Sequence, residues 1–418
     1  MTHRYLHTIC RTLVAVSIVA LVQHATLAAP KTKEPATAPA ATKQTKKPAA
    51  VNANTAGKNK TNKKTLPTKA AATATQAQNL PSYQNREEVR VFAKEIAERN
   101  GLDETRVLKS LEQAKYQPAV AKAIVPPSRT SVRNWEKYRD RYVEPVRIKG
   151  GLQFWEANEA ILQKTSERSG VPEEIIVAII GVETIFGKHT GSFRTVDALS
   201  TLAFDFPPAP RNRSDFFRSE LEALFLLSRE TGMDPLEIKG SFAGAVGLGQ
   251  FMPSSWRRFA VDGNLDGTID LFHSVDDAVA SVGNFLKIHG WKKGDFWFVR
   301  AAVSDSESTR QNVAEIVDEG ILPRFTNEQL KQRGIVSLPS EFNESIKPEE
   351  LLCLVDLPIG TETVDYRVGG KNFYAVTRYN RSNFYAMSVM ELAIALRNAR
   401  KATMPNNGVN STLAKSKG

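Results

Sequence analysis

The chain has 418 residues, and its hydrophobic fraction of 41% is large enough for a folded core, so a wholly disordered protein is excluded. A chain of this length holds about two to three domains as a first estimate. The formal net charge of +11 suggests a nucleic-acid partner. However, residues 1–80 hold two arginines and ten lysines against one acid, Glu34, so residues 81–418 carry no net charge. The folded part is therefore not expected to bind nucleic acid.

The first 28 residues have the pattern of a secretory signal peptide. Arg4 and Arg11 precede the apolar run Leu13–Val22, and small residues follow near Ala28. The run is too short to span a bilayer comfortably, because about 20 residues are needed. We expect cleavage after Ala28 and a periplasmic protein, with an uncleaved membrane anchor as the alternative.

Two further segments are expected to be disordered. Residues 29–80 are mostly Ala, Lys, Thr, Pro, Asn and Gln, and residues 401–418 have a similar composition. Such segments cannot bury enough apolar surface to offset the entropy lost on ordering. We interpret them as a solvated linker and a tail on either side of a folded region at residues 81–400.

Helical signals dominate the folded region. Asp103 is a candidate N-cap, and Pro172 stands at the first position of a helix that Gly187 is expected to end. The predicted helices cover residues 86–101, 102–114, 152–169, 170–187, 213–230, 275–289 and 382–400. Strand-like runs at 351–357 and 372–378 predict a small β element at about 350–380. The predicted fold class is therefore mainly α (α+β).

One cysteine, Cys353, remains if the leader is removed, so no internal disulfide can form. It lies in the apolar run "LLCLVDL", which is typical of a buried strand. We expect a packed structural thiol and not a nucleophile.

A single carboxylate, Glu183, interrupts the uncharged run "IIGVETIFG" at residues 179–187. Burial near the end of an apolar helix should raise the pKa of this carboxyl group. A carboxyl group that is protonated at neutral pH suits the general acid of glycosidic bond cleavage. The alternative is a structural glutamate paired with an arginine or a backbone amide.

A glycine-rich segment, "KGSFAGAVGLGQFMPSSW", extends from Lys239 to Trp256. Its four glycines allow the backbone to approach a ligand closely. Ser241 and Gln250 can hydrogen-bond sugar hydroxyl or acetamido groups, and Phe251 offers an apolar surface for a sugar face. A glycine-rich turn packed between helices is the alternative.

The segment from Asp262 to Asp277 has oxygen-bearing side chains at the spacing of an EF-hand calcium loop. The candidate ligands are Asp262, Asn264, Asp266 and Thr268 at positions 1, 3, 5 and 7, and Asp276 at position 15. Gly267 suits the turn, but His273 occupies position 12, where a carboxylate is usual. A lengthened loop that holds a structural Ca²⁺ is expected, with a plain Asp/Asn/Gly turn as the alternative.

Together these motifs resemble the MltB-type membrane-bound lytic murein transglycosylases, the family 3 enzymes of bacterial cell-wall turnover. The resemblance runs from about Arg86 to Arg400. It rests on "GVPEEIIVAIIGVETIFGKHTGSFRTVDALSTLAFDFP", "GSFAGAVGLGQFMPSSW", "AVDGNLDGTIDL", "NFLKIHGW" and "TRYNRSNFYAMSV", which occur in the order of the family. It implies a lysozyme-like catalytic core at about 150–295 with a flanking helical domain and a small β domain.

The resemblance also assigns site residues. Glu183 matches the single catalytic glutamate of the family, and the metal candidates fall on its lengthened EF-hand-like loop, which accommodates His273. The positions that match its substrate-binding residues are Tyr138, Ser241, Gln250, Phe251, Tyr379, Asn380 and Tyr385. Ile185 departs from the family, where a basic or polar residue is common.

The chemistry that the resemblance implies needs one glutamate and no cofactor. The glutamate protonates the bond between N-acetylmuramic acid and N-acetylglucosamine, then removes a proton from the muramoyl C6 hydroxyl, which closes a 1,6-anhydro ring. No second carboxylate is expected in a comparable setting, because Asp197, Asp205, Glu220 and Glu222 lie on amphipathic or polar stretches.

Two alternative functions stay open: a muramidase that uses water, and a non-catalytic peptidoglycan-binding or calcium-stabilised scaffold protein. The expected partners are peptidoglycan glycan strands, with cell-wall synthesis or division proteins as further candidates. The protein is expected to be a monomer.

Overall fold

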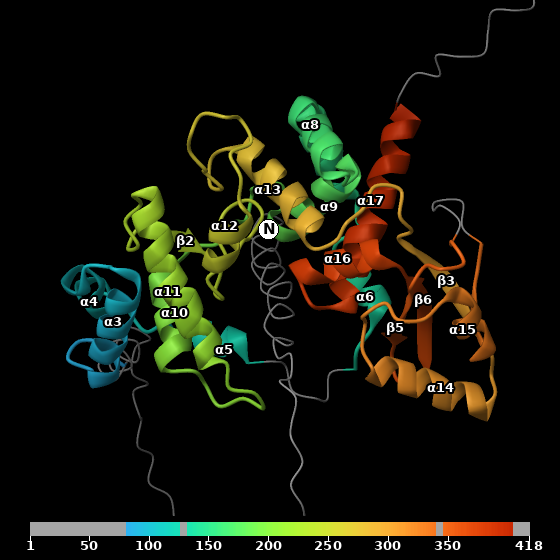
Figure 1. Cartoon of the computed structure of the whole chain (residues 1–418), viewed down its shortest axis with the longest axis horizontal. Helices are drawn as coiled ribbons and strands as arrows, with labels where there is room; N and C mark the ends of the chain where they lie inside the picture. Colours follow the sequence, from blue (N-terminus) through green and yellow to red (C-terminus); the bar gives the residue numbers. More distant parts are fainter. Residues whose placement is uncertain (1–80, 126–131, 340–345, 404–418) are drawn as a thin grey trace, which may run out of the picture. The chain divides into compact units, whose positions relative to one another are not determined.

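The structure is a computed structural model that describes residues 81–125, 132–339 and 346–403. The predicted signal peptide, the predicted linker and most of the predicted tail lie outside the described residues. Helices predominate in the part that the structure describes, as predicted, and the larger of its two sheets has four strands (Figure 1). None of the described helices is both long enough and apolar enough to cross a membrane.

The first helices agree with the predictions. Helix α3 (Glu87–Asn100) ends at Gly101, whose φ of 62° is left-handed and therefore suits glycine. Helix α4 (Glu104–Glu112) begins after Asp103, whose carboxylate accepts the N–H of the third helical residue. Helix α5 (Pro118–Ile124) follows and packs against the middle of the chain.

The helix predicted at 152–169 is two helices, α7 (Pro145–Ala157) and α8 (Glu159–Ser169). They meet at Asn158, which has a φ of −126° and a ψ of 25°. Its side-chain amide donates to the carbonyl of Phe154 at 2.7 Å. An asparagine side chain that bonds to nearby backbone in this way favours a helix end over a helix interior.

Helix α9 (Glu173–Thr184) is buried from Ile175 to its end, which explains why its sequence is apolar on all sides. It ends three residues before the predicted stop at Gly187. The chain turns at once because Ile185 and Phe186 have φ values of 51° and 57°. Pro172 is the N-cap residue and not the first helical residue.

Within the described residues, seven further helices contribute to the same large hydrophobic core as α9. They are α6 (Trp135–Arg139), α10 (Thr195–Phe204), α11 (Ser214–Thr231), α12 (Pro253–Phe259), α13 (Val275–Ile288), α16 (Lys371–Tyr379) and α17 (Asn383–Thr403). Helices α7, α8, α13 and α17 pack directly on α9. Residues 401–403, which were assigned to the tail, form the last turn of α17.

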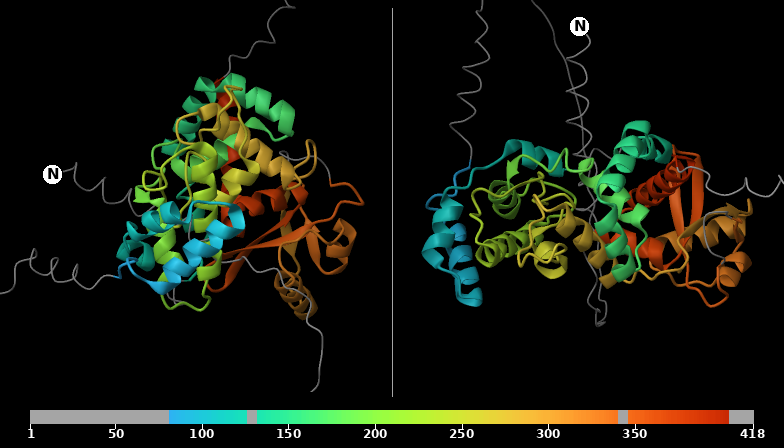
Figure 2. Two further views of the ribbon diagram at one scale, coloured as in Figure 1. Left: turned by 60° about the vertical axis from the view of Figure 1, so that its left-hand side comes forward. Right: turned by 90° about the horizontal axis from the view of Figure 1, so that it is seen from above.

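The four-stranded sheet is larger than the predicted β element. Its strands are β3 (Phe298–Val303), β4 (Ile335–Ser337), β5 (Cys353–Ile359) and β6 (Thr363–Gly369). They are antiparallel in the order β4-β3-β6-β5, and the sheet is drawn in orange to red-orange in both views of Figure 2. Helices α14 (Glu307–Asp318) and α15 (Asn327–Gln332) lie between β3 and β4 in sequence, and the unit has a hydrophobic cluster of its own.

The prediction of a strand at 372–378 was wrong, because this segment is helix α16. Its aromatic and β-branched residues favour a strand locally. In the fold, Phe373, Val376 and Thr377 share one buried helical face that packs against α13 and α17. Tertiary packing therefore outweighs the local preference.

Cys353 lies in β5 as predicted. It is buried, forms no disulfide, and its thiol faces the carbonyl oxygen of Gly369 at 3.4 Å. Burial raises the pKa of the thiol to about 12, so the thiol stays protonated and unreactive at neutral pH.

Candidate active site

Glu183 lies one residue before the end of α9, and only 3% of it is exposed. Its Oε1 accepts a hydrogen bond from the hydroxyl of Tyr385 at 2.6 Å. Burial raises the pKa of Glu183 to about 7, and the hydrogen bond from Tyr385 opposes part of this rise. The carboxyl group is thus poised to both release and take up a proton near neutral pH.

Three tyrosines lie around this carboxyl group, of which Tyr379 and Tyr385 are buried and Tyr138 is partly buried. Burial raises the pKa of Tyr138, Tyr379 and Tyr385, and the charge of Glu183 raises each of them further. Tyr138 comes from α6, Tyr379 ends α16, and Tyr385 lies in the first turn of α17. The structure therefore brings together four of the predicted site residues, from α6, from α9 and from the consecutive helices α16 and α17.

The turn after α9 connects Glu183 to the glycine-rich segment. The hydroxyl of Thr184 donates to the carbonyl oxygen of Leu248 at 2.9 Å and accepts the N–H of Gly187 at 3.0 Å. A few residues on, β1 (Phe193–Arg194) pairs with β2 (Lys239–Gly240). Thr184 was not predicted, because no local pattern distinguishes it apart from its place next to Glu183.

Gly191 and Gly240 make this connection possible. A Cβ atom on Gly191 would lie 2.1 Å from the carbonyl carbon and oxygen of Gly240, and Gly191 has a φ of 98°. Only glycine satisfies both constraints. The predicted close backbone approach is therefore present, but here it joins two segments of the protein.

The three predicted residues of the glycine-rich segment are each 3% exposed. The hydroxyl of Ser241 accepts the N–H of Ala245 at 3.0 Å, so it shapes the turn. Gln250 has a φ of 52°, and its amide nitrogen donates to the carbonyl oxygens of Thr190 and Gly247.

Gln250 also has spare hydrogen-bonding capacity, because its Oε1 accepts no hydrogen bond from the described residues. Phe251 packs against Tyr379 with ring centroids 5.7 Å apart, and the Tyr379 hydroxyl donates to the carbonyl oxygen of Gly249. Asn380, which is 1% exposed, follows Tyr379 as the C-cap of α16. The glycine-rich segment thus contacts the tyrosine cluster around Glu183.

Arg147 on α7 holds the last turn of α9 and was not predicted. Its Nε donates to the carbonyl oxygen of Gly181 at 2.9 Å, and its guanidinium group also donates to the carbonyl oxygen of Arg141. A cation at the C-terminal end of a helix is electrostatically favourable. The sequence pattern did not distinguish Arg147 from any exposed arginine.

The expectation that no other carboxylate is comparably placed needs correction, because Asp197 and Glu220 are 3% and 4% exposed. Asp197 is paired with Arg194 at 2.6 Å. Glu220 accepts hydrogen bonds from the N–H and hydroxyl of Ser254, and burial raises its pKa. Helix α10 is buried over nearly its whole length, whereas Glu220 lies on the buried face of α11.

Asp205 and Glu222 are paired with arginines, at 2.9 Å to Arg86 and 2.7 Å to Arg99. Glu183 differs from all four of these acids, because within the described residues its carboxyl group has a single hydrogen-bond partner, the hydroxyl of Tyr385.

The predicted metal ligands Asp262, Asn264, Asp266 and Thr268 form one tight loop. The carboxylate of Asp262 accepts the N–H groups of the third and fifth residues after it, and that of Asp266 accepts the N–H and hydroxyl of Thr268. Asp276 lies in the first turn of α13, and its backbone carbonyl contacts the loop at Gly263. No group of three or more His, Cys, Asp or Glu residues is arranged to hold a metal within the described ranges.

Asp277, which was not among the predicted ligands, closes this loop. It is fully buried, and its two carboxylate oxygens accept the N–H groups of Gly263 and Asp270, each at 2.8 Å. Its neighbour Ser274 caps α13. The shape of the loop is therefore fixed by a buried side chain of the protein.

A buried carboxyl group with a raised pKa, at the end of an apolar helix and beside a glycine-rich turn, is an arrangement suited to general acid chemistry. The family model described as transglycosylase SLT domain matches residues 84–394. The chain belongs to this family.

Known proteins agree with this assignment. Membrane-bound lytic murein transglycosylase B of Escherichia coli strain K12 is 36% identical over 327 residues, which are 76% of this chain and 85% of the relative. The crystal structure of soluble lytic transglycosylase SltB1 from Pseudomonas aeruginosa is 38% identical, with a TM-score of 0.66 over 75% of this chain and 99% of that one.

Two further structures were solved with ligands. Escherichia coli Slt35 in complex with calcium is 35% identical, with a TM-score of 0.63 over 77% of this chain and 97% of that one. SltB3 from Pseudomonas aeruginosa in complex with NAG-anhNAM-pentapeptide is 26% identical, with a TM-score of 0.60 over 76% of this chain and 80% of that one.

Proposed function

We propose that this protein is a lytic murein transglycosylase that cleaves the β-1,4 bond between N-acetylmuramic acid and N-acetylglucosamine without water. The proposal rests on one observation above all, the buried carboxyl group of Glu183 with a pKa of about 7. We assign Glu183 both proton transfers and place the chemistry in a core at about residues 150–295.

In the first step, the protonated Glu183 donates its proton to the glycosidic oxygen, and the bond from that oxygen to C1 of the muramoyl residue breaks. The N-acetylglucosamine leaves with a new hydroxyl group. The acetamido group of the substrate is proposed to stabilise the positive charge at C1, because ordinary retaining glycosidases use a second carboxylate there.

In the second step, the Glu183 carboxylate removes the proton from the C6 hydroxyl of the same muramoyl residue. The C6 oxygen then bonds to C1 and closes the 1,6-anhydro ring. Glu183 ends protonated as it began, so no water, cofactor or metal takes part. A pKa near 7 suits both steps, because the group must lose and regain a proton in each cycle.

The substrate is proposed to lie along the glycine-rich segment and the tyrosine cluster. The Oε1 of Gln250, which lacks a donor among the described residues, is proposed to accept a hydrogen bond from a sugar hydroxyl or acetamido N–H. Tyr138, Ser241, Phe251, Tyr379, Asn380 and Tyr385 are proposed to shape this groove.

Digestion of purified peptidoglycan tests the proposal. We expect soluble muropeptides with 1,6-anhydro ends, each one water lighter than a hydrolysed product. Reducing ends in their place would identify a muramidase. Release of no product would favour the non-catalytic peptidoglycan-binding alternative.

Tyr385→Phe should move the pH dependence of the reaction. The hydroxyl of Tyr385 lowers the pKa of Glu183, so its removal raises that pKa further. Glu183 must be protonated for the first step, so the alkaline fall in kcat/KM should move up by about one pH unit. Tyr366→Phe in β6 is the matched control and should leave the profile unchanged. An unmoved profile for Tyr385→Phe would contradict the assignment.

We further propose that residues 262–276 bind a structural Ca²⁺. Their donors are carboxylate, amide and hydroxyl oxygens, which hard cations prefer. The proposed ligands are Asp262, Asn264, Asp266, Thr268 and Asp276. The calcium complex of the similar Slt35 supports this proposal.

Calcium should therefore stabilise the folded protein, by about 2.7 kcal/mol when free Ca²⁺ is 100 times the Kd. The melting temperature should be higher in Ca²⁺ than in a chelator. Differential scanning fluorimetry with Ca²⁺ or EGTA measures this. Asp266→Asn should abolish the response, whereas Asp215→Asn on α11 should keep it. Equal melting temperatures for the unsubstituted protein in Ca²⁺ and EGTA would refute a calcium site.

A periplasmic location is proposed from the leader pattern at residues 1–28. The Escherichia coli relative is named as membrane-bound, so an uncleaved or lipid-attached form is the competing possibility. The intact mass of the protein from a cell-envelope fraction decides between them, because cleavage after Ala28 predicts a mature chain that starts at Ala29.

A further inference from the structure

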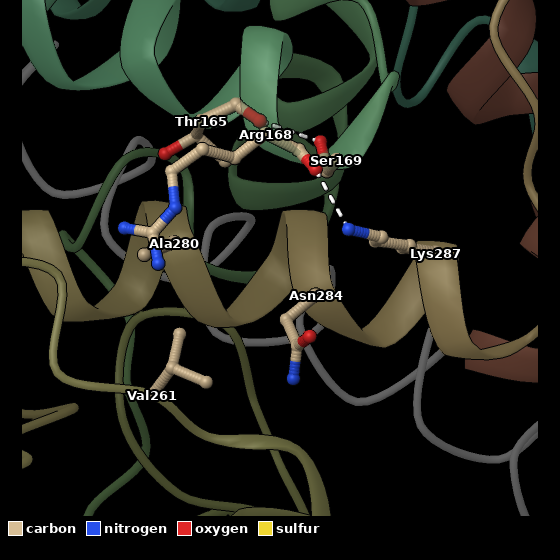
Figure 3. A pocket seen from close by; sticks show the side chains of 7 residues that line it. All are labelled: Thr165, Arg168, Ser169, Val261, Ala280, Asn284 and Lys287. Carbon is tan, nitrogen blue, oxygen red and sulfur yellow. Dashed lines mark hydrogen bonds between the residues drawn. The ribbon is translucent and has the colours of Figure 1, made fainter.

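Helices α8 and α13 enclose a small pocket, which Figure 3 shows at close range. Gly283 lets the two helices approach closely, because a Cβ atom there would lie 2.4 Å from a side-chain carbon of Thr165. The cavity has a volume of about 90 Å³, which is room for several water molecules and therefore for a carboxylate or phosphate group.

The polar lining of this pocket is cationic or neutral. The polar residues are Thr165, Arg168 and Ser169 from α8, and Asn284 and Lys287 from α13; the other two lining residues are small and apolar, and no acid is among the seven. In Figure 3 the Arg168 side chain extends from α8 toward Ala280, and Lys287 reaches from α13 to the end of α8.

Both cations have unused donors. The Lys287 ammonium donates to the carbonyl oxygen of Arg168 at 2.8 Å, which leaves two of its three N–H groups. Neither cation forms an ion pair with any acid of the described residues. Two more exposed lysines lie nearby: Lys164 one turn earlier on α8, and Lys293 next to Gly170. The charges of Arg168 and Lys287 are thus not neutralised by ion pairs among the described residues, and the nearest acid in sequence, Glu167, accepts a hydrogen bond from Gln163 instead.

The pocket is separate from the proposed chemistry. Arg168 lies just before the start of α9, whereas Glu183 lies at its other end, and ten residues of helix span about 15 Å. A ligand here would therefore contact the protein away from the bond that is cut.

We propose that this pocket is an accessory site for a carboxylate of the peptides attached to the glycan. The inference rests on the proposed function, which makes peptidoglycan the polymer at hand. A peptide that is linked to the sugar through its amino end carries a free carboxylate, and Arg and Lys bind such groups by charge-assisted hydrogen bonds. The site would anchor the wall while Glu183 acts on the glycan strand.

The test measures binding of the full-length Glu183→Gln protein, which leaves the wall intact, to insoluble peptidoglycan. Adding Arg168→Ala and Lys287→Ala should weaken binding about tenfold. An amidase removes the peptides but leaves a lactyl carboxylate on each muramoyl sugar. On this glycan the parent and the double variant should bind equally, because the proposed ligand is the carboxylate of the peptide and not that of the sugar. Arg106→Ala with Lys109→Ala on α4 is the matched control, because it also removes one exposed arginine and one exposed lysine.

Three results would overturn the proposal. The first is a loss of peptidoglycan binding no larger than that of the control pair, and the second is an equal loss of binding to peptide-free glycan. The third comes from binding to phosphatidylglycerol vesicles: if the double variant loses affinity for these vesicles and not for peptidoglycan, the pocket binds lipid phosphate. The protein with Glu183 intact is assayed in parallel on intact peptidoglycan. Failure to release anhydro products there would refute the proposed function and leave the binding comparison valid.

Discussion

Glu183→Gln is expected to lower the release of 1,6-anhydro muropeptides by about a thousandfold or more. Glutamine has the same shape and can accept the hydrogen bond from Tyr385, but it can neither donate the proton to the glycosidic oxygen nor take one from the C6 hydroxyl. Initial rates on purified peptidoglycan, measured by liquid chromatography and mass spectrometry, give the ratio.

Glu220→Gln is the matched control, because Glu220 is also buried with a raised pKa but is held by Ser254. Its activity should stay within a few-fold of the parent. If Glu183→Gln retained more than a tenth of the activity, or if both variants lost activity equally, the assignment of Glu183 would be wrong.

Glu183→Gln also tests the pKa of Glu183 without any substrate. Burial raises this pKa from 4.5 to about 7, so between these pH values the folded protein keeps a proton that the unfolded chain releases. Stability of the parent should therefore fall as the pH rises from 4.5 to 7. Because glutamine does not titrate, the stability of Glu183→Gln relative to the parent should be about 3 kcal/mol higher at pH 8 than at pH 4. Urea unfolding at the two pH values measures it.

Gly191→Ala should give the largest loss of stability among single methyl additions near the site, about 3–5 kcal/mol. The added Cβ would lie 2.1 Å from the backbone of Gly240, so β1 and β2 must separate. That separation would also displace the glycine-rich segment that contacts the tyrosines around Glu183, so activity should fall with stability.

Gly290→Ala separates steric clash from backbone strain. Gly290 has a φ of 96°, close to the 98° of Gly191, but a Cβ atom there would meet nothing within 4 Å. It should therefore show the left-handed strain alone, about 1–2 kcal/mol. Equal losses for the two variants, measured by urea unfolding, would show that the contact between Gly191 and Gly240 does not matter.

Elements with strong local signals were predicted from the sequence alone. The structure confirms the N-cap at Asp103, the helix stop at Gly101 and the apolar helix that carries Glu183. Each of these features depends on residues that are neighbours in the sequence. The same holds for buried Cys353 in β5. These features follow from capping, helical periodicity and the apolar run of a strand.

Features that depend on distant packing were missed. Helix α16 has the composition of a strand and becomes a helix because its buried face packs on α13 and α17. Strands β3 and β4 depend on partners up to 71 residues away, as the pairing of Phe298 with Gly369 shows. The burial of Asp197 and Glu220, and the contacts of Arg147 and Asp277, likewise exist only once the helices are assembled.

The predicted site was a set of residues without geometry. Glu183 was predicted from its apolar surroundings, and in the structure burial raises its pKa. The tyrosines and the glycine-rich segment entered through the family resemblance, because nothing in local spacing links Tyr138 to Tyr385. The structure supplies that link by placing both next to Glu183.

The origin of the oxygen at the new muramoyl end tests the central claim most directly. Peptidoglycan is digested in water enriched in ¹⁸O, and the soluble muropeptides are weighed. If the C6 hydroxyl of the sugar closes the ring, the products carry anhydro ends and no ¹⁸O. Products that gain one ¹⁸O at C1 in the presence of this protein would show that water attacks, and would contradict the transglycosylase mechanism.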